Sequence, residues 1–167
     1  ADFISPATIF RPSIIVGDSR TGFTTTFHGF YAALRLAHTL LNSSAVDNNG
    51  QPTRLTLSGT ECKNLVSVDW VSAAIAEILV QPEHHGNTFH LTSSSPVTTR
   101  VMRDVLEELI DNCKNRFVGP GPLKDPSLLE RLFYEQMQVY DSYWRDDPAF
   151  DTANAQAALP GLPCPEI

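Results

Sequence analysis

The feature that most constrains the fold is an apolar, β-branched run near the start of the chain. Residues 8–16, with the sequence TIFRPSIIV, lie between Pro6 and the pair Gly17-Asp18. A short run of this kind, bounded by turn residues, predicts a buried strand of a largely parallel sheet. Because Pro12 removes a donor from the ladder, it predicts an edge, a bulge, or a strand that ends and turns toward a site.

The rest of the chain alternates between predicted helices and predicted strands. The helical patterns cover residues 30–41, 70–79, 100–110 and 128–143, and the strand patterns cover residues 53–58, 64–68 and 87–91. Residues 113–126 are rich in proline and glycine and predict a linker without regular structure, and irregular chain is predicted after the last helix. This order predicts an α/β fold that opens as though the first half of a sheet were missing.

Asp69 immediately precedes the second predicted helix. Its carboxylate can accept hydrogen bonds from the free amides of a first helical turn, so we predict that it is the N-cap. A catalytic acid is the less favoured interpretation of this residue.

Charge and cysteine content restrict the partners of the chain. The formal net charge is −7, from 12 Lys and Arg against 19 Asp and Glu, and no basic cluster is present. Nucleic-acid binding depends on such clusters, so no nucleic-acid partner is expected. Cys62, Cys113 and Cys164 are odd in number and widely spaced, which favours reduced thiols over disulfides. The pair His84-His85 lacks neighbouring acidic or thiol ligands, so no metal site is expected.

Targeting signals are also lacking in the sequence. No run reaches the roughly 18 apolar residues of a membrane span. The first residues, ADFI, do not form a basic segment that leads into an apolar signal core. We therefore expect a cytoplasmic protein that has no membrane partner.

Three segments of the chain follow one another in an order that is typical of one protein family. They are FRPSIIVGDSRTG at residues 10–22, LVSVDWVSAAI at residues 65–75, and GNTFHLT at residues 86–92. These segments resemble the extended short-chain dehydrogenase/reductases of the NAD-dependent epimerase/dehydratase superfamily, and in particular acyl thioester and fatty-acyl reductases. The resemblance implies the C-terminal strands of a Rossmann-like NAD(P)-binding fold together with a mostly helical substrate-binding lobe.

Two features that this family requires are absent from the sequence. The chain has no glycine-rich cofactor turn after a strand, because residues 119–122, GPGP, follow no predicted strand and carry prolines where amide donors are needed. None of its tyrosines has a lysine four residues later, as the catalytic pair requires. We therefore expect a fragment without catalytic residues, whose N-terminal dinucleotide-binding half is missing and which is inactive as an isolated chain.

The resemblance also implies which residues would form a site. The strand end that would pass the nicotinamide comprises Pro12, Ser13, Ile14 and Ile15, for which a buried strand with an incidental proline is the alternative. The loop that would line the substrate pocket contributes Ser19, Arg20, Phe23, Thr24, Thr25, Thr26 and Phe27, for which a solvated loop is the alternative. Arg20 could hold a phosphate or form a surface ion pair. The complete protein would use NAD or NADP, which this chain alone would not bind tightly.

Three hypotheses for the function follow. The leading one is the substrate-binding portion of an NAD(P)-dependent oxidoreductase that reduces a carbonyl or an acyl thioester. A second is a fragment of a nucleotide-sugar epimerase or dehydratase. The third is a non-enzymatic binding module, whose strand edge at residues 8–16 would need a partner or a second copy of the chain.

The predicted domain organisation runs along the sequence. Residues 1–112 would form the C-terminal portion of the reductase domain with its substrate-binding insertions, residues 113–126 the linker-like stretch, and residues 127–167 a C-terminal helix and tail. In this arrangement the substrate is a small molecule, and the missing half of the same protein is the macromolecular partner. Self-association into a homo-oligomer is a further hypothesis.

Overall fold

The structure, a computed structural model, describes residues 7–27, 29–42, 51–111 and 113–167. The chain forms two compact units, each assembled from separate stretches of sequence. Unit 1 comprises Ala1–Thr25, Asn64–Pro96 and Pro148–Ile167, and unit 2 comprises Thr26–Lys63 and Val97–Asp147. Helices and short, mostly parallel strand pairs make up both units, so the predicted α/β class is confirmed.

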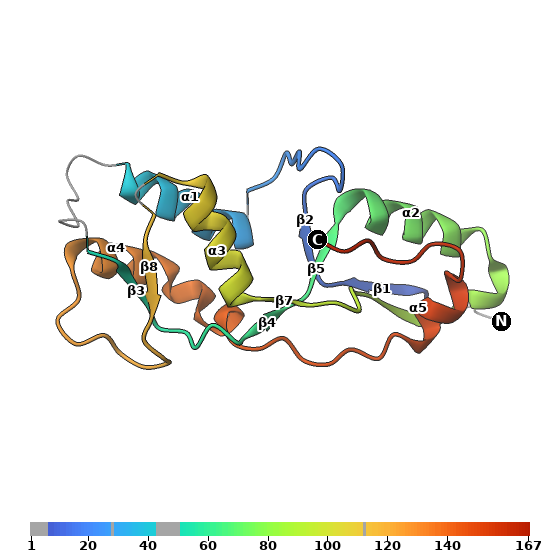
Figure 1. The fold of residues 1–167 in the computed structure, drawn as a ribbon. Coiled ribbons are helices and arrows are strands. Elements are labelled where there is room, and N and C mark those ends of the chain that lie inside the picture. Colours follow the sequence, from blue (N-terminus) through green and yellow to red (C-terminus); the bar gives the residue numbers. More distant parts are fainter. Residues whose placement is uncertain (1–6, 28, 43–50, 112) are drawn as a thin grey trace. The chain divides into compact units, whose positions relative to one another are not determined.

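Unit 1 contains the strands that the apolar run predicts. Strand β1 (Ile9–Pro12) pairs in parallel with β6 (Thr88–Leu91), and β2 (Ile14–Val16) pairs in parallel with β5 (Leu65–Ser67) (Figure 1). The change of neighbour occurs at Ser13. Its amide donates to the Leu91 carbonyl at 3.1 Å, whereas the amide of the next residue, Ile14, donates to the Asn64 carbonyl at 3.2 Å. The predicted strand is therefore confirmed as two short strands that are separated directly after Pro12. The prediction that it is buried is wrong, because most residues of β1 are exposed and none of β2 is buried.

Helix α2 (Val68–Leu79) and the short helix α5 (Ala153–Ala158) supply the helical part of the unit 1 core. Trp70, Val71, Ala74 and Ile78 of α2 are buried at helical spacing, which places one face of the helix in the core. The core also includes Val66, Phe89, Leu91, Ala155, Ala158 and Leu159. Helix α5 packs against β6, so the prediction of irregular chain throughout the tail is wrong at this point.

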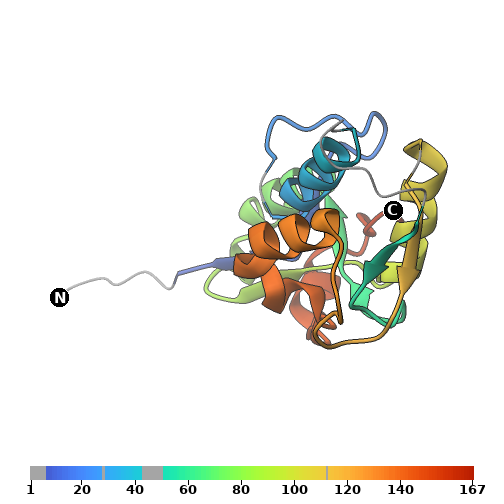
Figure 2. The ribbon, with the colours of Figure 1, turned by 90° about the vertical axis from the view of Figure 1, so that its left-hand side faces the viewer.

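Unit 2 is built from helices around short strand pairs. Strand β3 (Thr53–Leu55) pairs in parallel with β8 (Asn115–Phe117), and β4 (Cys62–Lys63) pairs antiparallel with β7 (Val97–Thr98). The α-helices of unit 2 are α1 (Phe30–Leu41), α3 (Thr99–Leu109) and α4 (Leu128–Met137). The short 3-10 helix η1 (Pro82–His84) belongs to unit 1 instead. Helices α1 and α4 pack side by side (Figure 2).

The sequence predictions for unit 2 agree with the structure in part. The helix predicted over residues 30–41 is confirmed at both ends. The prediction that residues 113–126 lack regular structure is wrong for β8, which pairs with β3. The helix predicted over residues 128–143 is α-helical only to Met137 and continues as the 3-10 helix η2 (Gln138–Trp144).

Membrane spans and disulfides can be examined across the residues that the structure describes. No helix in this part of the chain combines the length and the apolar composition that crossing a membrane requires. Cys62, Cys113 and Cys164 are all free.

Candidate functional site

The first candidate site lies where two parallel strands of unit 1 end. Strand β2 ends at Val16 and its parallel neighbour β5 ends at Ser67, so their carboxyl ends meet at one edge of the sheet. Open α/β sheets bind their ligands at this edge. The segment 17–23, here called the GDSRTGF loop, follows β2, and helix α2 follows β5.

Asp18 closes the GDSRTGF loop on itself. Its amide donates to the Phe23 carbonyl at 3.0 Å, and its carbonyl accepts from the Gly22 amide at 2.8 Å. Its carboxylate Oδ1 accepts from the Thr21 hydroxyl at 2.8 Å and from the Thr21 and Arg20 amides at 2.9 and 3.1 Å. These hydrogen bonds, above all that of the Thr21 hydroxyl, lower the pKa of Asp18. The loop is therefore a folded turn with a defined backbone.

Asp69 joins the same loop to helix α2. Its Oδ1 accepts from the Ser19 amide at 2.9 Å, and its Oδ2 accepts from the Ser19 hydroxyl at 2.7 Å. These two donors lower the pKa of Asp69 well below its usual range. The prediction that Asp69 is the N-cap of the helix is wrong, because α2 begins at Val68 with Ser67 as its N-cap. The carboxylate of Asp69 instead accepts hydrogen bonds from Ser19, which lies 50 residues away in the sequence.

Replacing Gly17 with alanine is expected to disrupt this loop. A Cβ at position 17 would lie 2.4 Å from the Gly22 carbonyl oxygen, a backbone atom that cannot move without opening the turn. Overpacking of this kind costs about 1–3 kcal/mol. Urea unfolding measures the loss, and Gly161→Ala is the matched control, because a Cβ there would meet nothing within 4 Å. Equal stability of the two variants would contradict the described loop.

The strand end predicted to pass the cofactor is held by a buried asparagine. Asn64 Oδ1 accepts from the Ser13 hydroxyl and from the Ser93 amide, both at 2.8 Å, and its Nδ2 donates to the Ser93 carbonyl at 2.7 Å. Asn64 and Ser93 are both buried. Asn64 therefore forms a junction that connects Ser13, where the strand changes its neighbour, to Ser93 after β6. Asn64 was not predicted from the sequence, although an amide side chain directly before the buried strand LVS was a signal for it.

The other predicted cofactor residues extend from this junction along the strand. Pro12 is the last residue of β1, opposite Leu91, and Ile14 and Ile15 belong to β2. The side chain of Ile15 is exposed. The role of these residues toward a cofactor stays a prediction.

The predicted substrate residues are distributed over the two units. Ser19, Arg20, Phe23, Thr24 and Thr25 belong to unit 1, and Thr26 and Phe27 belong to unit 2. The hydroxyl of Ser19 is engaged by Asp69, while Phe23 is 68% exposed. The Phe27 ring is also exposed and meets the Tyr31 ring edge-on, with their centroids 6.0 Å apart. Their role in binding a substrate also stays a prediction.

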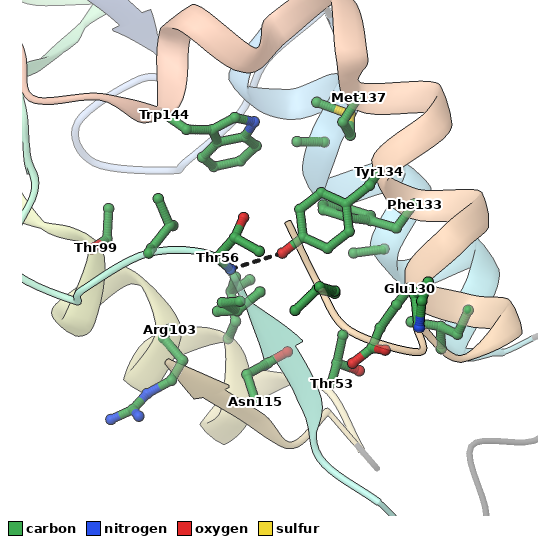
Figure 3. Close-up of a pocket in the computed structure, with 18 of the residues that line it drawn as sticks. Thr53, Thr56, Thr99, Arg103, Asn115, Glu130, Phe133, Tyr134, Met137 and Trp144 are labelled. Atoms are coloured by element: carbon green, nitrogen blue, oxygen red, sulfur yellow. Dashed lines mark hydrogen bonds between the residues drawn. The ribbon is translucent and has the colours of Figure 1, made fainter. Parts of the chain in front are cut away.

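Unit 2 contains a second candidate site, a cavity of about 910 Å³. Most of its lining is apolar and comes from α1, α3 and α4, with the segment 120–126 as a further wall (Figure 3). The apolar lining includes Phe30, Ala33, Leu34, Ala37, Leu41, Met102, Leu106, Leu129, Phe133 and Met137. Cavities of this size accommodate small-molecule ligands. Among the described residues, none of the predicted substrate residues lines this cavity. The cavity itself was not predicted from the sequence.

Polar and charged side chains also line the cavity, among them Arg103, Arg131 and Arg145, and several others are already bound within the protein. Glu130 accepts from Arg54 Nε at 2.9 Å and from Arg54 Nη2 at 2.7 Å, and also from the Ser127 amide at 2.8 Å. The guanidinium is the main cause that lowers the pKa of Glu130 to about 2. Arg54 also donates to the carbonyls of Lys124 and Asp125, both at 2.9 Å. The pair therefore fixes the segment 120–126 to the amino end of α4.

Tyr134 is engaged in the same wall. Its hydroxyl accepts from the Thr56 amide at 2.9 Å and donates to the Arg54 carbonyl at 3.0 Å (Figure 3). Cys113 is buried at the cavity, and this burial raises the pKa of its thiol. Within the described chain, no group of three His, Cys, Asp or Glu side chains is placed to hold a metal ion. The larger part of the cavity surface is thus apolar, with polar groups beside it.

Comparisons with known proteins place this geometry in context. Residues 4–75 match the model of an NAD-binding family that is described as "Male sterility protein". No curated protein matches the chain. The terminal R domain from the myxalamid PKS-NRPS biosynthetic pathway is similar in structure, with a TM-score of 0.62 and 22% identity. The match covers 97% of this chain and 40% of that domain.

A UDP-glucose 4-epimerase from Thermotoga maritima matches with a TM-score of 0.47 and 13% identity, over 90% of this chain and 38% of the epimerase. The chain thus spans about two fifths of the length of these solved structures. The similarity to the R domain confirms that the fold is part of a Rossmann-like fold.

Proposed function

We propose that this chain is the substrate-binding portion of an NAD(P)-dependent oxidoreductase that reduces an acyl thioester or another carbonyl. The observation that carries this proposal is the family match over residues 4–75, which includes β1, β2 and the GDSRTGF loop. The loop lies at the carboxyl edge of the parallel strands, where such folds bind ligands.

The proposed cofactor site lies at the strand end formed by residues 12–15. In the complete protein, the backbone of this strand would face the nicotinamide carboxamide, and the buried Asn64 would keep the strand in place through Ser13. The reduced cofactor supplies a hydride. Within the described residues, β1 and β2 each have one neighbouring strand. We assign the other edge to the remaining part of the same protein, which would also provide the catalytic residues.

The cavity in unit 2 favours an acyl thioester over a nucleotide sugar. Its walls are mostly apolar, and Glu130 and Tyr134 are already hydrogen-bonded within the protein. The hydroxyl groups of a sugar would lie against these apolar walls, at a cost of about 1–3 kcal/mol for each one that stays unpaired. An apolar acyl chain gains free energy from the same burial.

The proposed reaction balances with one cofactor molecule. The acyl carbon accepts a hydride from NAD(P)H, its bond to sulfur breaks, and the products are an aldehyde, a free thiol and NAD(P)⁺, with one proton taken up by the thiolate. In this scheme, the residues of this chain bind and orient the substrate.

The assay that tests the proposal uses the complete protein expressed from its natural gene. Oxidation of NADH and NADPH is followed with long-chain and short-chain acyl thioesters, and separately with UDP-sugars. We expect turnover with acyl thioesters and a lower KM for the longer chains. Conversion of UDP-sugars without net cofactor oxidation would instead support the epimerase hypothesis, and no turnover with either class would favour a binding module.

Filling the cavity is expected to weaken binding of long acyl chains. Ala33 on α1 is buried and lines the cavity, so Ala33→Phe would place a ring in the space for the ligand. We expect KM for long-chain thioesters to rise about tenfold or more, a change of roughly 1.4 kcal/mol. The matched control is Thr39→Phe on the exposed face of the same helix.

A fluorescence measurement makes the cavity prediction independent of activity. Trp144 lines the cavity, whereas Trp70 is buried in the core of unit 1. A long-chain acyl ligand is therefore expected to change the emission of Trp144, and the change should be absent from Trp144→Phe and reduced in Ala33→Phe. An unchanged response in Ala33→Phe, with the fold intact by circular dichroism, would rule out the cavity as the acyl site.

A further inference from the structure

The side chain of Asp69 anchors the GDSRTGF loop from outside the loop. Its carboxylate receives both the amide and the hydroxyl of Ser19, at 2.9 and 2.7 Å. The carboxylate of Asp18, in contrast, accepts its three described hydrogen bonds from residues of the loop itself. Asp18 therefore shapes the turn, and Asp69 fixes the turned loop to the first turn of α2.

The position of this anchor indicates a role other than stabilising the fold. Both hydrogen bonds are exposed, and exposed contacts contribute little to global stability. The depressed pKa of Asp69 means that its carboxylate remains ionised through the neutral range and does not release the loop on mild acidification. An ionised acceptor with two donors from one residue restricts where that residue can lie.

The contacts of the loop also decide which side chains it can offer to a ligand. The hydroxyls of Ser19 and Thr21 are taken by Asp69 and Asp18. Phe23 differs, because its carbonyl is held by the Asp18 amide at 3.0 Å while its ring is 68% exposed. A single exposed ring is common on a protein surface. What favours a ligand contact for Phe23 is its place in a loop at the carboxyl edge of the parallel strands, where such folds bind ligands.

We infer that Asp69 is a positioning residue that holds the GDSRTGF loop through Ser19, so that Phe23 contacts the substrate at the carboxyl edge of the sheet. This inference rests on the proposed function, and it gives Ser19 the role of an anchor in place of a direct substrate ligand. Phe23 becomes a determinant of specificity.

The kinetic test compares variants of the complete protein. We expect Asp69→Asn and Phe23→Ala each to raise KM for acyl thioesters about tenfold, with a much smaller change in kcat. Ser19→Ala should have a smaller effect, and adding it to Asp69→Asn should not raise KM further, because the two residues act as one unit. Ser19→Thr keeps the hydroxyl and should retain the wild-type KM. Glu77→Gln, an exposed carboxylate on the same helix, is the control.

Amide hydrogen exchange tests the anchor apart from activity. In Asp69→Asn, exchange at the Ser19 amide should accelerate about tenfold or more, while exchange in the β6 core stays unchanged. Unchanged exchange at Ser19 would overturn the inference. Accelerated exchange with an unchanged KM would overturn the positioning role. If exchange accelerates but the complete protein does not turn over thioesters at all, the proposed function is contradicted, while the role of Asp69 in holding the loop is supported.

Discussion

Replacing Glu130 with alanine is expected to destabilise unit 2 by about 3 kcal/mol, because the change removes a buried carboxylate and leaves several hydrogen-bond donors without their acceptor. Glu130 is 2% exposed and accepts from the guanidinium and the amide of Arg54 and from the Ser127 amide. Without it, these donors lose their acceptor, the capping box of α4 is lost, and the cavity wall loosens. Urea unfolding measures the change. The control is Glu135→Ala at an exposed position of the same helix.

The pH dependence of stability gives a second measurement on the same pair. The pKa of Glu130 is lowered from 4.5 to about 2 in the folded protein, so its contribution is fully present above the unfolded value. That contribution is lost as the pH falls from 4.5 through about 2. In Glu130→Gln, the loss of stability over this interval should be smaller than in the wild type. A loss below about 0.5 kcal/mol in Glu130→Ala, the range of ordinary surface changes, would contradict the described pair.

Replacing Asn64 with alanine is expected to cost unit 1 about 3 kcal/mol, since buried groups lose their only described partner. The Ser93 amide and carbonyl and the Ser13 hydroxyl all bond to the Asn64 side chain. The matched control is Asn154→Ala, which removes one exposed hydrogen bond to the Thr88 carbonyl. Urea unfolding of the two variants makes the comparison, and equal midpoints would show that the junction does not hold the strands.

Local patterns predicted the elements whose own sequence determines them. The helix over residues 30–41 has apolar residues at helical spacing and runs into an asparagine, so both ends could be read from neighbouring residues. The strand over residues 8–16 was also predicted, and Pro12 marked the place where it divides. These features depend on contacts that are close in the sequence.

Contacts between distant residues explain what the sequence did not predict. Arg54 and Glu130 are 76 residues apart, and Ser19 and Asp69 are 50 residues apart. Nothing in either neighbourhood specifies the partner, so Asp69 was predicted to be a local cap. Helix α5 is similar, because burial of Ala155 and Ala158 in the unit 1 core stabilises a six-residue helix that is too short to form alone.

The two candidate sites also differ in whether their residues are close together or far apart in the sequence. The loop after β2 could be predicted because its residues are contiguous and carry the family resemblance. The cavity could not, because its walls come from α1, α3, α4 and the segment 120–126, which only the fold brings together. Its main sequence signal was the apolar face of each helix, which equally predicts an ordinary core.

The central claim is that this chain binds the substrate of a hydride-transferring reductase. The most direct measurement supplies the complete natural protein with a long-chain acyl thioester and a reduced nicotinamide cofactor deuterated at the transferable position, and analyses the product by mass spectrometry. We predict an aldehyde with deuterium on the former carbonyl carbon, formed more slowly by Ala33→Phe. An unreacted thioester, with cofactor and substrate both binding to the folded protein, would contradict the claim.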